Sequence, residues 1–255
     1  KFIYTLMKKI NILNIRFSNL DINNLTDEIF RIKNKKKIHI STVNAAKFFQ
    51  CKNNKIMMNV VKNSNFITID GVSFLFAGKI LGEREKINRV AGYDLMENLF
   101  KKREYTNDKF FFLGSKKSVV KKAVSNKKKK YKKINIVGYN DGYFWKNEEK
   151  IIKKINTLNP DILLISITSP LQEEFIYRYK SKLKTKVILL LGGSFEVLSG
   201  RLKRAPILIQ KIGMEWFYRL VQEPRRLFWR YLTSNSKFVM LVFFELIKKI
   251  FNKLK

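Results

Sequence analysis

The stretch DILLISITSPLQEEFIYRYKSKLKTKVILLLGG, residues 161–193, decides the fold of this chain. It opens with an apolar run over residues 161–167, continues through a longer polar segment, and ends in a second apolar run over residues 187–191. Strands buried on both faces have this continuous apolar character, and a helix-length connection returns the chain to a parallel neighbour. The stretch therefore predicts a strand, a helix and a second, parallel strand.

Short apolar runs alternate with longer helix-like segments on both sides of this stretch. The expected strands cover residues 10–17, 37–43, 66–69, 109–113 and 134–137, and the expected helices cover residues 21–33, 45–62, 72–81, 93–102 and 147–158. This alternation is typical of an α/β fold with a Rossmann-like parallel sheet and helices on both faces. We assign residues 1–205 to this core and residues 206–255 to a C-terminal helical appendage.

The charge of the chain restricts its partners. The 53 lysines and arginines stand against 20 acidic residues, which gives a formal charge of +33. Such a basic protein is expected to bind phospholipid, nucleotide phosphates or nucleic acid. The lysine-rich segment at residues 116–133 admits a second interpretation, a solvated helix face and turn without a partner.

The chain holds one cysteine, Cys51, and one histidine, His39. These counts exclude an intramolecular disulfide and a zinc site built on several cysteines or histidines, and with a single histidine we expect no serine–histidine triad. Any general base is therefore a carboxylate or, less readily, a lysine or tyrosine. We expect no metal and no cofactor.

A segment rich in arginine and large aromatics, RAPILIQKIGMEWFYRLVQEPRRLFWRY, occupies residues 204–231. Buried helices rarely carry so many arginines, and disordered tails rarely carry so many aromatics, so an anionic and partly apolar partner is expected. Pro224 predicts a boundary between two helices, and Arg219, Arg226 and Arg230 then share one helical face. The expected interfacial aromatics are Trp216, Phe217, Phe228, Trp229 and Tyr231.

These features predict a basic and aromatic membrane-binding appendage, and the alternative is a helical hairpin packed on the core or in a homo-oligomer interface. No apolar stretch is long enough to cross a membrane, because a spanning helix needs about 20 apolar residues. Residues 1–13 lack the apolar core and the cleavage site of a signal peptide. We therefore expect a cytoplasmic protein, bound peripherally to the inner face of the cell membrane.

Small and polar residues follow the expected strands, and ligands of open α/β sheets bind beyond the carboxyl ends of strands. The residues predicted to surround the site are Thr42, Asn44, Asp70, Gly114, Gly138, Ser169, Gln172 and Gly192. Asp70 precedes Gly71, which lets the backbone turn closely, and its carboxyl group is either a general base or a helix N-cap. Thr42 and Asn44 either contact a sugar or phosphate or cap the following helix.

A series of motifs runs in order over residues 10–232: STVNAAKF, ITIDGVSF, RVAGYDLME, FFLGS, IVGYNDGYF, SPLQEEFI, GGSFEVLSGRLKRAP and GMEWFYRLVQEPRRLFWRYL. Together they resemble the WecG/TagA/CpsF glycosyltransferases. The resemblance implies an inverting, metal-independent transferase at the cytoplasmic membrane face. Such an enzyme moves N-acetylmannosamine or a related hexose from a UDP-sugar to a polyprenyl-diphosphate-linked sugar, for wall teichoic acid, enterobacterial common antigen or capsule.

The resemblance also implies roles for single residues. Asp70 matches the family's proposed base, and Thr42 and Asn44 lie with it in the catalytic pocket. Contacts to the donor are expected from Arg89, Gly114, Ser115, Gly138, Gly142, Tyr143, Gln172, Gly192, Gly193 and Glu196, and Tyr143 or Phe144 is expected to stack on uracil. Contacts to the lipid diphosphate are expected from Arg204, Arg219, Arg225, Arg226 and Arg230. For Arg89 the alternative is a surface ion pair with Glu83 or Glu85.

The chain departs from the family pattern in two places. It has SITSPLQE at residues 166–173 where the family usually has Gly-x-Gly-x-Pro-Lys-Gln-Glu, and Phe195-Glu196 where the family usually has Phe-Asp. The departures at Thr168 and Glu196 keep a non-catalytic scaffold of the same fold open as a second function class. A basic nucleic-acid-binding protein is the third, but no helix-turn-helix, zinc, RNP or KH signature is present, so we expect no nucleic acid partner.

Overall fold

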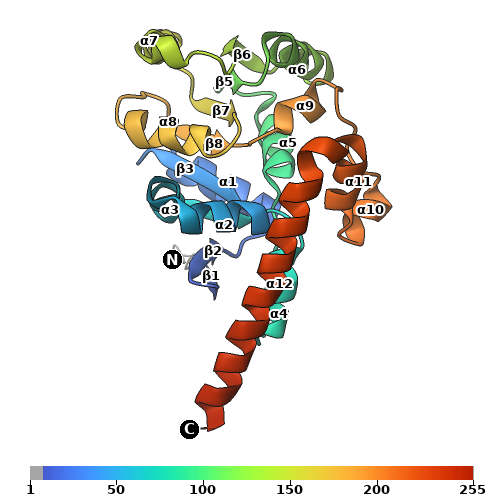
Figure 1. Ribbon diagram of the computed structural model, residues 1–255. Helices are drawn as coiled ribbons and strands as arrows, with labels where there is room; N and C mark the ends of the chain where they lie inside the picture. The colour runs from blue at the N-terminus through green and yellow to red at the C-terminus, as the bar shows by residue number, and fades with distance from the viewer. Residues whose placement is uncertain (1–7, 255) are drawn as a thin grey trace.

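A six-stranded parallel sheet forms the centre of the protein in the computed structural model, which describes residues 8–254 (Figure 1). The strands are β3 (Ile38–Val43), β4 (Phe66–Ile69), β5 (Lys109–Gly114), β6 (Asn135–Asn140), β7 (Ile162–Ser166) and β8 (Val187–Leu190), in the spatial order β4-β3-β8-β7-β5-β6. The predicted α/β class with a Rossmann-like parallel sheet is confirmed. Residues 1–7 of the expected core and Lys255 of the expected appendage lie outside the described residues.

Helices cover both faces of the sheet. One face packs under α1 (Ile22–Ile32), α5 (Gly92–Arg103), α6 (Lys117–Lys130) and α9 (Ser194–Leu198), and the other under α3 (Lys55–Lys62), α7 (Glu148–Leu158) and α8 (Leu171–Tyr179). A short 3₁₀ helix, η1 (Trp145–Asn147), precedes α7. Side chains alternate across a strand. In β5, Phe110 and Phe112 therefore pack in the core under α1, α5, α6 and α9, while Phe111 and Leu113 pack in the core under α3, α7 and α8.

The single strand expected at residues 10–17 is wrong. The segment is an antiparallel hairpin of β1 (Lys9–Ile12) and β2 (Ile15–Ser18), separate from the main sheet. Leu13 and Asn14 reverse the chain with positive φ angles of 52° and 63°. The apolar pattern does mark the reversal, because the alternation of Ile10 and Ile12 changes phase at Ile15 and Phe17, and Asn14 tolerates a positive φ.

The single helix expected at residues 45–62 is also wrong. It is divided into α2 (Ala45–Asn53) and α3 at Asn54, whose backbone is extended with φ −136° and ψ 107°. The Asn54 side-chain oxygen accepts a hydrogen bond from the Met57 N–H at 3.0 Å, so the residue ends one helix and caps the next.

The C-terminal region is helical, with α10 (Ile207–Lys211), α11 (Glu215–Gln222) and α12 (Pro224–Leu254). Pro224 starts α12, as predicted. Figure 1 shows α12 passing α2 and α4 (Ser73–Ile80) and projecting beyond the sheet. None of the helices within residues 8–254 combines the length and apolar character that a membrane crossing requires.

The middle of α12 is fastened to the core. Phe238 and Val242 are buried in a cluster with the hairpin, α2 and α4. The Phe238 ring lies 5.0 Å from the Phe74 ring and 6.2 Å from the Phe48 ring, centroid to centroid, in edge-to-face geometry. This contact fixes the position of α12 relative to the sheet.

Candidate active site

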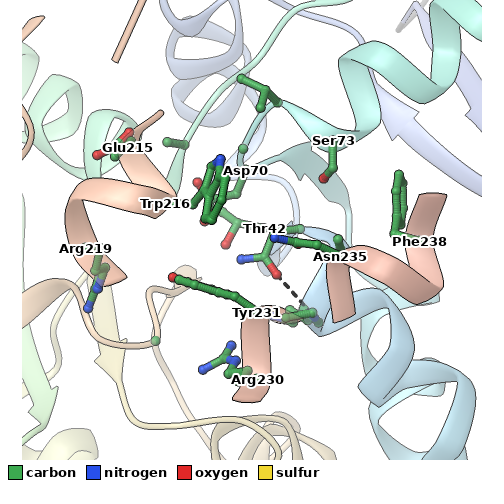
Figure 2. Close-up of a pocket in the computed structure, with 18 of the residues that line it drawn as sticks. Thr42, Asp70, Ser73, Glu215, Trp216, Arg219, Arg230, Tyr231, Asn235 and Phe238 are labelled. Carbon is green, nitrogen blue, oxygen red and sulfur yellow. Dashed lines mark hydrogen bonds between the residues drawn. The ribbon is translucent and has the colours of Figure 1, made fainter. Parts of the chain in front are cut away.

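A cavity of about 790 Å³ lies beyond the carboxyl ends of β3, β4 and β8. In Figure 2, Thr42 and Asp70 approach it from the sheet, while Trp216 comes from α11 and Tyr231 from α12. These strand ends are neighbours because β3 lies between β4 and β8. The C-terminal helices thus complete a site that the sheet encloses only in part.

Most of the residues predicted to act line this one cavity. They are Thr42, Asn44, Asp70, Arg89, Ser169, Gln172, Gly192, Gly193, Arg204, Arg219, Arg226 and Arg230. The cavity lining does not include the predicted residues Gly114, Ser115, Gly138, Gly142, Tyr143, Glu196 and Arg225.

Asp70 stands directly after β4. Its N–H donates to the Val43 carbonyl at 2.9 Å, which holds the ends of β3 and β4 together. Gly71 follows with φ +97°, a conformation that residues with side chains rarely adopt, and turns the chain toward α4. The N-cap position of α4 is Val72, without a side-chain cap bond, so the N-cap interpretation of Asp70 is wrong.

The environment of Asp70 suits a general base. Burial raises the pKa of its carboxyl group above the ordinary value, and the Arg89 guanidinium opposes this shift. Glu215, from α11, raises the pKa of Asp70 further. A carboxylate of raised pKa accepts a proton more readily than a solvated one.

Thr42 and Asn44 flank Asp70 at the end of β3. The Asn44 side-chain oxygen accepts a hydrogen bond from the Lys47 N–H at 2.9 Å, so Asn44 caps α2 and lines the cavity at the same time. Thr42 is buried against the start of α5, where a Cβ on Gly92 would lie 3.1 Å from Thr42 Cγ2. A side chain on Gly92 would therefore require Thr42 to shift by a few tenths of an ångström.

An ion-pair network joins the appendage to the core beside Asp70. Arg204 contacts the Asp94 carboxylate with two nitrogens, at 2.6 and 2.8 Å, and its Nε lies 3.3 Å from Glu215 Oε1. The Arg204 guanidinium also stacks 4.5 Å from the centroid of the Tyr93 ring. Arg204 therefore fastens α11 to α5, in addition to lining the cavity.

Arg89 takes part in the same network. Its Nη1 lies 3.6 Å from Glu215 Oε2. The expected alternative of an ion pair with Glu83 or Glu85 is wrong, since Glu215 is the acid that Arg89 meets and Glu85 pairs with Lys8. Arg89 keeps its place in the cavity wall.

Three arginines of α11 and α12 bring further positive charge. Arg219 lies against the β8 loop, where a Cβ on Gly193 would be 2.9 Å from Arg219 Nη2. Arg230 Nε is buried and has no hydrogen-bond partner among residues 8–254. Burial lowers the pKa of Arg230, with Arg226 and Arg219 adding to the effect. A buried N–H without an acceptor is costly, so this wall favours an anion that can accept from Arg230 Nε.

The total charge of the lining is strongly positive. Its basic residues are Lys47, Arg89, Arg204, Arg219, Arg226 and Arg230, and its acidic residues are Asp70 and Glu215. Lys47, Arg204 and Arg226 have acidic partners just outside the lining, namely Glu173, Asp94 and Glu223. The remaining excess of basic groups favours an anionic ligand.

Some lining residues were not assigned to the site from the sequence. Trp216 and Tyr231, expected at a membrane interface, pack edge to face in the cavity wall with ring centroids 6.0 Å apart. Asn235 and Glu215 were not singled out at all. A signal for Asn235 exists, because it follows Tyr231 by one helical turn on the stripe that carries Arg230.

A buried network supports the cavity wall between α2 and α8. Lys47 Nζ lies 2.8 Å from Glu173 Oε1, and both side chains are almost fully buried. Gln172 Nε2 donates to the same oxygen at 2.8 Å, while its own Oε1 accepts from the Gly192 N–H at 3.2 Å. Lys47 thus lines the cavity with its ammonium group already paired to a buried carboxylate.

Ser166, where the family usually has glycine, also has a structural role. Its hydroxyl donates to the Gly192 carbonyl at 2.5 Å and accepts from the Phe195 N–H at 3.1 Å, which holds the loop after β8. Glu196 instead pairs with Arg201 and does not line the cavity, so its extra methylene does not alter the lining.

A second group of predicted residues lies at the ends of β5 and β6, outside the cavity. The Gly142 N–H donates to the Ser115 carbonyl at 2.9 Å, and a Cβ on Gly114 would lie 2.2 Å from the Ser166 carbonyl oxygen. These glycines permit close backbone contacts within the protein. Tyr143 beside them is 70% exposed.

Two expectations in this region are wrong. Gly138 is inside β6 rather than at a strand end, and a Cβ there would lie 2.9 Å from the Phe111 ring, so it serves packing. Phe144 is buried in the core and its ring stacks 4.9 Å from Trp145, so it is not available to a uracil ring.

Within the described part of the chain, no three His, Cys, Asp or Glu side chains gather in a group that could hold a metal ion. The site therefore offers guanidinium, ammonium and backbone N–H groups to an anion, with one carboxyl group as acid or base. Such a constellation, at the open edge of a Rossmann-like sheet, is typical of a transferase that acts on phosphorylated substrates.

Comparison with known proteins identifies the kind of transferase. The profile described as "Glycosyl transferase WecG/TagA/CpsF family" matches residues 10–252. The chain belongs to this family of glycosyltransferases.

Two relatives have the name N-acetylglucosaminyldiphosphoundecaprenol N-acetyl-beta-D-mannosaminyltransferase. The protein from Bacillus subtilis (strain 168) is 34% identical over 241 residues, covering 94% of this chain and 93% of the relative. The protein from Staphylococcus aureus (strain MW2) is 26% identical over 222 residues, covering 86% and 87%. The match extends over the sheet and the C-terminal helices alike.

The Lys47–Glu173 pair yields a prediction about stability. Lys47→Met leaves a buried carboxylate without its cation and should lower the free energy of unfolding by about 3 kcal/mol, measured by urea denaturation. The double variant Lys47→Met/Glu173→Gln should recover most of this loss. Lys52→Met, on the exposed side of the same helix, is the matched control. Equal stability of the Lys47→Met and Lys52→Met variants would contradict the assignment.

Proposed function

We propose that this protein transfers N-acetylmannosamine or a related hexose from a UDP-sugar to a polyprenyl-diphosphate-linked sugar, with inversion and without a metal ion. The observation that carries the proposal is a carboxyl group of raised pKa inside a cavity lined by arginines. Support also comes from the names of the relatives, which describe an N-acetylglucosaminyl-diphosphoundecaprenol acceptor. The product belongs to synthesis of a cell-surface polymer such as wall teichoic acid.

In the proposed reaction, Asp70 removes the proton from the acceptor hydroxyl as its oxygen attacks the anomeric carbon of the donor. The bond from that carbon to the UDP oxygen breaks, and the electron pair leaves with UDP. Single displacement at the anomeric carbon inverts its configuration. Thr42 and Asn44 lie next to Asp70 and orient the sugar hydroxyls.

The departing diphosphate needs positive charge, because UDP leaves as an anion. Arg89, Arg219, Arg226 and Arg230 line the cavity and are placed to meet this charge. Guanidinium groups contact phosphate oxygens in pairs, which supplies orientation as well as charge. These cations take over the role that a divalent ion has in metal-dependent transferases.

We further propose that the C-terminal helices bind the cytoplasmic face of the cell membrane peripherally. The exposed aromatic and apolar side chains on α10 to α12 include Ile207, Leu208, Phe217, Phe228, Trp229 and Phe244. Exposed apolar groups combined with basic residues favour an anionic bilayer surface. A polyprenyl-linked acceptor lies in that same surface.

The family membership argues against the nucleic-acid-binding alternative, and the intact cavity argues against a silent scaffold. Homo-oligomer formation stays a prediction. Transfer to the lipid acceptor decides between enzyme and scaffold, and the product mass identifies the sugar when several UDP-sugars are compared.

Asp70→Asn should lower kcat by about a thousand-fold, because the amide cannot accept the proton, while UDP affinity stays close to wild type. The measurement is transfer from a UDP-sugar to the lipid-linked acceptor, with UDP binding by calorimetry. Asp141→Asn is the matched control, since Asp141 also precedes a glycine after a strand but does not line the cavity. Unchanged turnover in Asp70→Asn removes this residue from the role of base.

The pH dependence follows from the state of Asp70. The base is active when deprotonated, so kcat/KM should fall as the pH drops through the pKa of Asp70, which burial places above the ordinary 3.8. Arg89 lowers this pKa, so Arg89→Met should move the acidic limb of the profile to higher pH. Arg225→Met, outside the cavity, should leave the limb in place. An unshifted limb in Arg89→Met would count against Asp70 as the titrating group.

Membrane binding has its own test. Trp229→Ala should weaken partitioning into vesicles that contain anionic phospholipid by about ten-fold, and raising the salt concentration should weaken it further. Trp229 is 69% exposed and lies outside the cavity, so the fold and the site are spared. Tyr143, an equally exposed aromatic residue, follows β6 at the opposite edge of the sheet. Tyr143→Ala should therefore leave partitioning into the vesicles unchanged. Equal partitioning of both variants would refute a membrane role for α12.

A further inference from the structure

The cavity continues beyond the arginines into a groove with an entirely different lining. Its far part lies between α4 and α12 and is formed by Phe76, Ala77, Ile80, Phe238, Val239, Val242, Phe243 and Leu246. None of these side chains is charged. The cavity is therefore divided into a cationic chamber at Asp70 and an apolar groove that opens from it.

Two exposed apolar side chains on α4 line the groove. Phe76 is 61% exposed and Ile80 is 50% exposed, although neighbouring Phe74 and Ala77 are buried. Phe76, Ala77 and Ile80 recur at spacings of one, three and four residues, so they share one face of the helix. An apolar face on a short core helix needs a partner outside the core.

On α12 a single stripe connects the two parts. Arg226, Arg230, Tyr231 and Asn235 line the chamber, and Phe238, Val239, Val242, Phe243 and Leu246 line the groove on the following turns. At 1.5 Å per residue, about 24 Å of helix separate Arg230 from Leu246. Within the lining the stripe changes from cationic to apolar once, and the next basic residue on this face is Lys249, about one turn beyond Leu246.

A contact between the same two helices lies at the rim of the groove. Lys249 Nζ donates to the Leu81 carbonyl just after α4. Its ammonium group is thus held at the rim by the main chain, which leaves the inner lining apolar.

We infer that the groove between α4 and α12 binds the first isoprenoid units of the acceptor, next to the diphosphate that the chamber arginines hold. This inference rests on the proposed function and adds a subsite to it. A diphosphate joined directly to a branched hydrocarbon chain is complementary to this lining, because its anion matches the cationic chamber and its chain matches the apolar groove. The groove is continuous with the chamber, so a single ligand fills both.

The groove also has a consequence for transfer. A chain held along α4 and α12 leaves the bilayer at a defined place, so the sugar beyond the diphosphate reaches Asp70 in one orientation. Phe76 and Phe243 therefore act as specificity determinants for the lipid, at a distance from the reacting atoms.

Binding of two probes by calorimetry, in buffer without vesicles, tests this inference without any turnover. Wild-type protein should bind farnesyl diphosphate at least ten-fold more tightly than methyl diphosphate, since only the former has a chain for the groove. Phe243→Ser should lose about ten-fold in affinity for farnesyl diphosphate and nothing for methyl diphosphate. Phe76→Ser should behave in the same way.

Phe244→Ser is the matched control, because Phe244 adjoins Phe243, is 54% exposed against 58%, and lies outside the cavity lining. It should bind both probes like wild type. Equal affinity of wild-type protein for the two probes overturns the inference, as does an equal loss in Phe243→Ser and Phe244→Ser. Because both probes lack a sugar acceptor, tight farnesyl diphosphate binding with no sugar transfer would reject the proposed reaction and leave the groove standing.

Discussion

The packing of Phe238 against Phe74 and Phe48 is the contact on which the site depends. It joins α12 to a cluster built from α2, α4 and the N-terminal hairpin, far from α12 in sequence. Two turns before Phe238, the same helix carries Arg230 and Tyr231 into the cavity. A rigid helix transmits this placement, so the aromatic cluster decides where the arginines stand. Without it the cavity would lose one wall, and the carboxyl group after β4 would return to water with an ordinary pKa.

The electrostatics of the cavity reconcile two opposing demands. An anion site needs cations, whereas a general base needs a raised pKa, which cations oppose. Burial supplies the main upward shift at Asp70, and Glu215 adds to it while pairing with Arg89 and Arg204. Glu215 therefore limits the effect of the arginines on the base. A bound diphosphate would act in the same direction, because its negative charge offsets the same guanidinium groups.

The local sequence pattern was sufficient to predict the main sheet and the residues that end its strands. A buried strand and the turn after it are formed by consecutive residues, so a short stretch of sequence identifies both. Thr42, Asp70 and Gly192 were found in this way. Ion pairs between residues far apart in the sequence could not be predicted. Arg89 pairs with Glu215, and Glu173 pairs with Lys47. Periodicity shows which face of a helix is apolar but not what covers that face. For the same reason Trp216 and Tyr231 were expected at the membrane and instead line the cavity.

The long C-terminal helix is apolar on more of its circumference than one buried stripe requires. Phe238 and Val242 face the core, whereas Trp229, Met240 and Phe244 are exposed on other sides. A helix in water normally keeps such a second face polar, so its presence indicates a second apolar environment. Because both faces belong to one rigid element, any surface that binds the outer face also orients the cavity. Under the proposed function, the helix that closes the site also presents it to the bilayer, so that a lipid-linked substrate meets an assembled pocket.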